Sequence, residues 1–288
     1  MAKAAAKTGI MPMALVAIEQ SFPQKERILD DALAYRMLSF GPKIFVRAMR
    51  SDWTRRRVIE LSERTQPGIW GGLLCRKRYI DEKLLASRDK VRSVVNLGAG
   101  FDTRLYRLPG LASLLAWEVD QSENMEAKKR RLREALGSLP SNVKLISIDF
   151  DREDLSAILT SQGYSTSMRT FFLMEAVTQY LTGAGIATTF DFLAKAASGS
   201  HLVFSYVRKD FFDGRAMYGW EAGYRRFVLS GIWQSAMEPD HIPDFLVKHG
   251  WKVLEHKGYD EMARAYIAPA GRALTSTPVE RMIFALKM

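Results

Sequence analysis

After Arg92 the chain alternates short apolar runs with amphipathic stretches of helical period, and this alternation restricts the possible folds most strongly. Strands separated by helices imply right-handed crossovers and a largely parallel sheet. The last run follows the sixth with little helix between them, so we expect it to enter antiparallel at the sheet edge. We therefore predict an α/β fold with a seven-stranded, mostly parallel, doubly wound sheet. The predicted strands are 93–97, 113–118, 143–148, 170–174, 202–206, 251–256 and 281–286, and the helices between them are 122–136, 155–161, 182–197 and 240–249.

Residues 23–90 precede this alternation and place apolar side chains at helical spacing, which predicts an all-helical leading part. Gly41-Pro42 is expected to separate two helices. Further interruptions are expected at Pro67-Gly68 and Gly71-Gly72, before a helix that leads into the sheet. We predict one domain over 23–288, with 23–90 as its helical N-terminal part.

Residues 1–22 contain lysines and then an apolar stretch that is too short to span a bilayer and carries a proline. No convincing cleavage signal follows it. We expect a mobile or docking N-terminal segment, a cytoplasmic protein and no contact with a membrane.

Residues 207–238 do not fit the alternation, because aromatic residues there stand among many charges. An insert after the fifth strand would lie over the carboxyl ends of the strands, where ligands bind in open α/β sheets. One interpretation is a helical lid that covers a substrate. The alternative, an insert that packs on its own core, carries equal weight, since aromatics at helical spacing usually form core.

The net charge of +10 leaves nucleic acid as a possible partner. The basic clusters 55–57, 76–78 and 128–131 lie in predicted helices, where solvated faces often carry such charges, and no aromatic-basic motif accompanies them. We therefore expect no nucleic-acid partner. The single cysteine, Cys75, excludes an intramolecular disulfide and a cysteine-based metal site, and we expect no metal.

Gly98-Ala99-Gly100 follows the first predicted strand, and Asp120 follows about twenty residues later. Glycines let the backbone approach a ligand, and an acid at this distance can accept hydrogen bonds from a ribose. The third glycine of a dinucleotide fingerprint is replaced by Thr103, which favours an adenosine-type ligand without a diphosphate. Asp120 has an alternative role as the N-cap of the following helix.

Two further acids follow strands. Asp149, with Phe150 beside it, comes after the third strand, where an acid can meet an adenine amino group and an aromatic ring can cover the base. Asp149 is equally suited to a loop turn. Glu175 follows the apolar fourth strand directly, and because burying an unpaired carboxylate is costly, we expect a cationic partner for it.

These residues carry a family resemblance. The string from Asn96 to Arg104, then Glu118-Val119-Asp120 and residues 175–182, resembles the leucine carboxyl methyltransferase family, which includes bacterial S-adenosylmethionine-dependent O-methyltransferases that act on small molecules. The helix beginning Arg76-Lys77-Arg78 and the strand entry at 248–251 are also similar to the family's.

The resemblance implies a class I methyltransferase sheet and S-adenosylmethionine as cofactor. In it, Arg76 would pair with the methionine carboxylate and Glu175 with the amino group. The remaining cofactor contacts would be Gly98, Ala99, Gly100, Asp120, Gln121, Asp149 and Phe150.

The methyl acceptor is expected to be a small acidic or phenolic molecule. A carboxylate is already ionised at neutral pH and needs no base, whereas a hydroxyl does. The four histidines lie in no catalytic motif, so carboxyl methylation is slightly favoured. Tyr180, Tyr206 and Arg208 are the candidate catalytic and substrate contacts, with Arg208 neutralising an acidic acceptor. Methylation of a protein C-terminus and a non-catalytic binding module are the alternatives.

Overall fold

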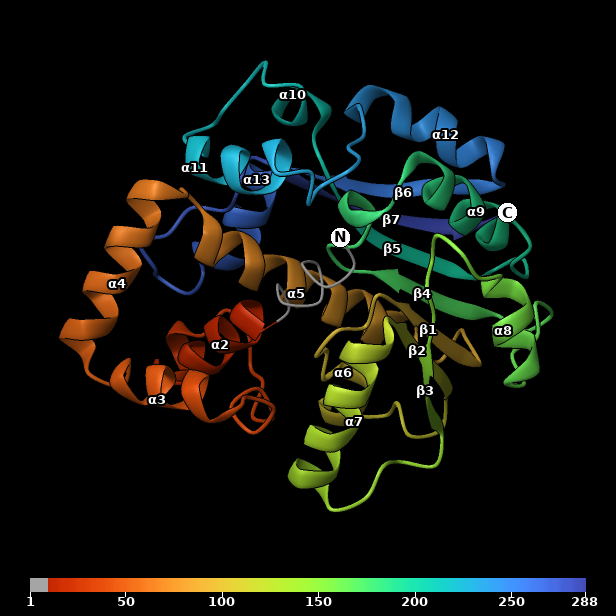
Figure 1. Cartoon of the computed structure of the whole chain (residues 1–288), viewed down its shortest axis with the longest axis horizontal. Coiled ribbons are helices and arrows are strands. Elements are labelled where there is room, and N and C mark those ends of the chain that lie inside the picture. The colour runs from red at the N-terminus through yellow and green to blue at the C-terminus, as the bar shows by residue number, and fades with distance from the viewer. Residues whose placement is uncertain (1–9) are drawn as a thin grey trace.

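The computed structural model describes residues 10–288 and contains the seven-stranded sheet that the alternation predicts (Figure 1). Its strand order is β3-β2-β1-β4-β5-β7-β6, and neighbouring strands among β1 to β5 run parallel. Each strand lies within two residues of its predicted bounds. The strands are β1 Ser93–Leu97, β2 Leu115–Asp120, β3 Val143–Ser147, β4 Thr170–Met174, β5 His201–Val207, β6 Trp251–Lys257 and β7 Glu280–Lys287.

The last strand departs from the prediction in one respect. β7 is antiparallel, as expected, but it lies between β5 and β6 and pairs with both, so β6 forms the edge. Two short helical turns after β6, α13 Tyr259–Met262 and η6 Ala263–Ile267, carry the chain back before it enters this gap.

Helices cover both faces of the sheet, which confirms the doubly wound arrangement. On one face, α8, α9 and α12 pack on side chains such as Val95 and Phe172. On the other, α5 and α7 pack on Val94 and Phe171. The elements of this central part are α6 Arg104–Arg107, α7 Ser122–Leu136, α8 Leu155–Ser161, η3 Thr178–Tyr180, α9 Gly183–Ala194, η5 Pro239–His241 and α12 Ile242–Lys248.

The leading part is helical, but two of its predicted interruptions are wrong. Residues 32–37 form successive turns, and Gly41-Pro42 lies inside the first turn of α3, where a proline is tolerated. The elements are α2 Ile10–Glu19, η2 Gln24–Glu26, α3 Phe40–Ala48, α4 Asp52–Thr65 and α5 Ile69–Ser87.

Gly71-Gly72, expected to interrupt a helix, lies within α5 instead. A Cβ on Gly71 would stand 2.1 Å from the carbonyl oxygen of Thr275, and one on Gly72 would stand 2.5 Å from the Thr277 methyl group. These glycines therefore let the segment at 275–277 pack directly on the helix. Helix α5 then leads the chain toward β1, as predicted.

The insert between β5 and α12 contains α10 Lys209–Phe212, α11 Glu221–Gly223 and the π-helical turn η4 Tyr224–Leu229. Its aromatic residues form a small hydrophobic cluster around Phe211, Trp220 and Trp233, in which the Phe227 and Trp233 rings stack with centroids 4.9 Å apart. The interpretation of these aromatics as a separate core is therefore the one that the packing supports.

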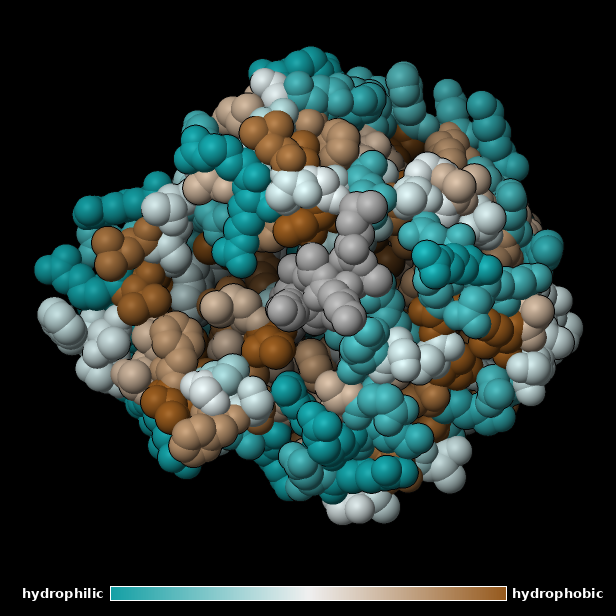
Figure 2. Space-filling model, viewed as in Figure 1, coloured by the Kyte–Doolittle hydropathy of each residue, from teal (hydrophilic) through white to brown (hydrophobic). Residues whose placement is uncertain are grey.

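Several large apolar side chains of α3 and α4 are exposed, among them Phe40 and Trp53, which are 79% and 72% exposed. Figure 2 shows hydrophobic and hydrophilic residues side by side over this part of the molecule. Among the described residues, no helix is long and apolar enough to cross a bilayer.

Candidate functional site

A cleft of about 740 Å³ opens at the carboxyl ends of the central strands. It lies where the strand order reverses. From β1 the chain adds β2 and β3 on one side, and it then returns to add β4 on the other side of β1. Ligands of open α/β sheets bind at such a switch point, and the cleft volume is in the range of small-molecule sites. The cleft collects all nine predicted cofactor contacts, namely Arg76, Gly98, Ala99, Gly100, Asp120, Gln121, Asp149, Phe150 and Glu175.

The glycine turn after β1 forms the floor of this cleft. Gly98 and Gly100 have φ angles of +71° and +41°, which side chains rarely adopt, and the amides of Gly98 and Ala99 donate to the Val119 carbonyl at 2.8 and 3.0 Å. A Cβ on Gly98 would stand 2.3 Å from a methyl group of Val177, two residues after Glu175. The turn therefore fixes the position of the segment that follows β4.

Gly98→Ala is expected to destabilise the protein by about 1–3 kcal/mol through strain at a positive φ, and further through the clash with Val177. Gly137→Ala is the matched control, because Gly137 has a φ of +82° and no heavy atom lies within 4 Å of its Cβ position. Urea unfolding and titration with S-adenosylhomocysteine, the product form of the cofactor that the resemblance implies, would compare them. We expect only Gly98→Ala to weaken ligand binding, and equal effects of the two substitutions would contradict this role of the turn.

Asp120 ends β2 and organises the turn beside it. Its Oδ2 accepts from the Gly100 amide at 2.6 Å, and its Oδ1 accepts from the Gln121 amide and the Asn124 side chain, both at 2.7 Å. The N-cap of α7 is Gln121, so Asp120 does not cap that helix. A carboxylate oxygen offers two lone pairs. Oδ2 therefore retains acceptor capacity for one ligand hydroxyl.

Gln121 also lines the cleft, and its side-chain oxygen is buried without a hydrogen-bond partner. Buried polar atoms are nearly always paired in native proteins. This orphaned acceptor beside Asp120 fits a ligand that brings hydroxyl or amino donors, as adenosine does.

Asp149 and Phe150 line the same cleft just after β3. Asp149 Oδ1 accepts from the Asp151 amide at 3.1 Å, so the residue shapes its own loop while it faces the cleft. Both interpretations of Asp149 from the sequence are thus compatible with its position.

Glu175 has the cationic partners that its burial requires. Its Oε1 lies 3.1 Å from both Arg76 Nε and Lys77 Nζ, and its Oε2 lies 2.7 Å from Arg104 Nη2. Burial by itself raises the pKa of Glu175, but Lys77, Arg104 and Arg76 outweigh it and hold the pKa well below its usual range. The carboxylate is therefore ionised throughout the physiological range.

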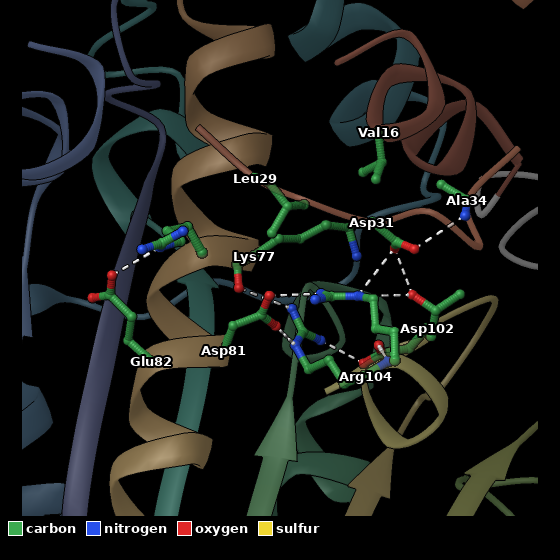
Figure 3. A network of polar contacts seen from close by, with 12 residues as sticks. Val16, Leu29, Asp31, Ala34, Lys77, Asp81, Glu82, Asp102 and Arg104 are labelled. Carbon is green, nitrogen blue, oxygen red and sulfur yellow. Dashed lines mark hydrogen bonds and ion pairs between the residues drawn. The ribbon is translucent and has the colours of Figure 1, made fainter. Parts of the chain in front are cut away.

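Arg104 is the centre of a wider ionic network, shown in Figure 3. Its guanidinium contacts three carboxylates, since it pairs with Asp81 at 2.7 Å and with Asp102 as well as with Glu175. Figure 3 labels the first two of these carboxylates. Its side chain is only 1% exposed, so these contacts lie in a low-dielectric interior. The network joins helix α5, the glycine turn and the end of β4.

Arg104 and Lys77 are site residues to which the sequence reasoning gave no role. Helical spacing could have indicated Lys77. Lys77 and Asp81 stand four residues apart on the buried face of α5, whereas Arg78 and Glu82 have the same spacing and pair on its half-exposed side. The interpretation of the basic clusters as solvated faces is wrong for half of their residues. Each cluster contributes buried cations, namely Arg55, Arg76, Lys77, Lys128 and Arg131.

The three predicted catalytic residues separate in the structure. Tyr180 lines the cleft. Tyr206 does not, because it is fully buried and its hydroxyl lies 2.7 Å from Nε2 of His256. Arg208 is also outside the cleft lining and forms a two-point contact with Asp210 at 3.1 and 2.5 Å. The geometry gives neither Tyr206 nor Arg208 a route to a substrate in this cleft.

Comparison with known proteins places this site in a family. The family model described as leucine carboxyl methyltransferase matches residues 9–194, well over half of the chain. The chain belongs to the leucine carboxyl methyltransferase family. Several similar proteins are named "Putative S-adenosyl-L-methionine-dependent methyltransferase". One from Mycobacterium avium is 29% identical and aligned over 83% of this chain and 81% of its own, and one from Mycobacteroides abscessus is 30% identical over 69% and 67%.

Solved structures share the fold of this family member at low identity. A duf574 family protein from Streptomyces avermitilis gives a TM-score of 0.54 at 14% identity and covers 80% of this chain and 88% of its own. An S-adenosylmethionine-dependent methyltransferase from Mesorhizobium loti gives 0.52 at 14%, over 74% and 98%. The protein is thus an S-adenosylmethionine-dependent methyltransferase with the class I fold.

Proposed function

We propose that this methyltransferase transfers the methyl group to an oxygen atom, either carboxylate or hydroxyl, of a small organic molecule. One observation carries the placement of the cofactor. Asp149, Asp120, the glycine turn and Glu175 follow the neighbouring strands β3, β2, β1 and β4, so they stand in a row along one cleft. That order matches the adenine, ribose, sulfonium and amino-acid parts of S-adenosylmethionine.

Each end of the row suits the chemistry expected there. Oδ2 of Asp120 and the unpaired Gln121 oxygen can accept from the ribose and its surroundings. At the other end, Glu175 offers an anion for the ammonium group, and Arg76 and Lys77 offer cations for the carboxylate. The amino-acid end of the cofactor is a zwitterion. When it binds, its ammonium group would pair with Glu175 and its carboxylate with Lys77, so two ion pairs would replace the one between Lys77 and Glu175. Arg76 keeps Glu280 as a second partner, 2.5 Å away.

The acceptor is proposed to bind beside Tyr180. S-adenosylmethionine supplies a methyl group that is already activated for in-line displacement, so the protein has to orient an oxygen atom and exclude water. Uncharged residues from helix α2 and the insert line this part, among them Met13, Ile232 and Gln234. The Gln234 amide donates to the Gln179 carbonyl at 2.7 Å, which ties the insert to the turn after β4. Such a lining favours a small molecule over a protein terminus, and in this role the insert forms one wall of the site while its aromatic residues pack as a core of their own.

The proposal is tested by incubating the protein with methyl-labelled cofactor and cell extract. Label in solvent-extractable small molecules is the expected result, released as methanol by base from an ester and retained in an ether. Base-labile label in a protein band would favour methylation of a protein carboxyl group instead. Absence of any labelled product would contradict the proposal.

Asp120→Asn is expected to weaken S-adenosylhomocysteine binding about 10-fold, because a charge-assisted hydrogen bond to the ribose becomes a neutral one. Asp154→Asn is the matched control. Asp154 caps helix α8 through the Ser156 and Ala157 amides and is not among the residues that line the main cleft. Isothermal calorimetry would compare the two variants, and unchanged affinity in Asp120→Asn would remove Asp120 from the site.

A further inference from the structure

The N-terminal arm, defined as residues 10–38, places a buried carboxylate beside the cofactor cleft. Asp31 is 3% exposed. Its Oδ1 accepts from two amides of the following turn at 3.0 Å, whereas its Oδ2 reaches the body of the protein. There Oδ2 accepts from the Thr103 hydroxyl at 2.5 Å and lies 3.3 Å from Arg107 Nε. One oxygen of Asp31 therefore shapes the arm, and the other connects it to the glycine turn.

From this contact an unbroken series of buried ion pairs leads to Glu175. Arg107 Nη2 lies 2.6 Å from Asp81, and Asp81 lies 2.7 Å from Arg104, which contacts Glu175 at 2.7 Å. Figure 3 shows the arm residues Val16, Leu29 and Asp31 on one side of the network and Asp81 and Arg104 on the other. Charges alternate along the series, and every side chain in it is at most 10% exposed.

A second route follows the backbone. Thr103 stands between Asp102 and Arg104, the two residues that pair with each other next to Glu175. By holding the Thr103 hydroxyl, Asp31 also fixes the start of helix α6, from which Arg104 projects. Both routes end on the same guanidinium.

We propose that Asp31 is a positioning residue for the amino-acid end of the cofactor, acting through Arg107, Asp81 and Arg104 on Glu175. The inference rests on the cofactor placement proposed above. When a bound ammonium replaces Lys77 at Glu175, Arg104 becomes the cation that must keep the carboxylate in place. Arg107 lies between Asp31 and Asp81 and pairs with both. By holding Arg107 in this place, Asp31 keeps Asp81 oriented toward Arg104.

The arm supplies its own matched control. Glu19 is a second arm carboxylate, 0% exposed, and it pairs with Arg272 at 3.1 Å and accepts from the Ile28 amide at 2.7 Å. Within the described residues, neither partner belongs to the network around Arg104. Glu19→Gln therefore loosens the arm without touching the series that leads to Glu175.

The experiment measures the affinity of the full chain for two ligands. S-adenosylhomocysteine has the amino-acid end, and 5′-methylthioadenosine keeps the adenosine and sulfur but lacks that end. In Asp31→Asn we expect a ~3- to 30-fold weaker affinity for the first and an unchanged affinity for the second. Glu19→Gln should lower the melting temperature but leave both affinities unchanged.

Three results would overturn the inference: Asp31→Asn altering both affinities equally, Asp31→Asn altering neither, or Glu19→Gln reproducing the selective loss. If Asp31→Asn does not fold, Arg107→Gln breaks the same ion-pair series at its next member. It should show the same selective loss, and its absence would count equally against the proposal. Failure of the unaltered protein to bind S-adenosylhomocysteine would instead refute the cofactor placement, so the two failures are distinguishable.

Discussion

Glu175→Gln is expected to reduce the affinity for S-adenosylmethionine about 100-fold or more. The substitution keeps the shape of the side chain but removes the charge of the one carboxylate, among the described residues, that pairs with Arg76, Lys77 and Arg104 together. A charge-assisted bond to the ligand ammonium is lost, worth about 1.5–3 kcal/mol, and the positive charge of Lys77 and its neighbours, now less fully neutralised, repels that ammonium. The measurement is calorimetric titration at constant salt concentration.

Glu82→Gln is the control for this variant. Glu82 also pairs with an arginine of helix α5, but the pair is 43% exposed and outside the cleft lining. We expect its removal to leave the affinity unchanged, since exposed pairs contribute little. Comparable losses in both variants would mean that the charge of Glu175 has no direct part in binding.

The same variant has a predicted pH dependence. The pKa of Glu175 is depressed in the folded protein relative to its ordinary value of 4.5. The ionised group therefore adds stability that is present above that value and is lost as the pH falls through the lower folded-state pKa. The difference in unfolding free energy between the unaltered protein and Glu175→Gln should be constant near neutral pH and shrink below about pH 4.5. A difference that grows on acidification would contradict the assignment.

Local patterns were sufficient to predict the sheet and the row of acids along it. Asp120 ends a strand, Asp149 and Glu175 each follow one, and parallel strands present their carboxyl ends at one edge. Periodicity could not predict where β7 inserts. That position depends on pairing with β5 and β6, which are remote in sequence.

Sequence patterns could not predict the partners of Glu175 either, because these partners are also remote in sequence. Arg76 and Lys77 are almost a hundred residues away from it, and Asp31 acts on Arg104 across more than seventy. A run such as Arg76-Lys77-Arg78 is ambiguous, because burial of two of its members and exposure of the third depends on which helix face meets the sheet. Charge clusters on helices therefore carry little information until the buried face is known.

The largest effect on stability is expected from Lys128, which the sequence alone suggested was solvated. Lys128 and Glu118 are both 0% exposed and lie 2.7 Å apart, and Lys128 also donates to the Ala99 carbonyl in the glycine turn at 3.3 Å. Burial raises the pKa of Glu118, and Lys128 opposes this increase. Lys128→Met leaves a buried carboxylate without its cation, so we expect a loss of about 3–5 kcal/mol of unfolding free energy. Arg130→Met, which alters an exposed neighbour on the same helix, should change it little.

The pH dependence of Lys128→Met distinguishes the effect of the lost charge on the unfolding free energy from the effect of lost packing. A carboxyl group whose folded-state pKa is raised contributes stability that is present below its unfolded pKa and lost as the pH rises. The deficit of Lys128→Met should therefore be larger at pH 8 than at pH 5, because Glu118 can take up a proton at the lower value. Adding Glu118→Gln should recover most of the deficit, since an amide oxygen can still accept from the Tyr106 hydroxyl, now 2.6 Å from the carboxylate. A deficit that is independent of pH and survives in the double variant would show that the methylene chain of Lys128 contributes the stability, rather than its charge.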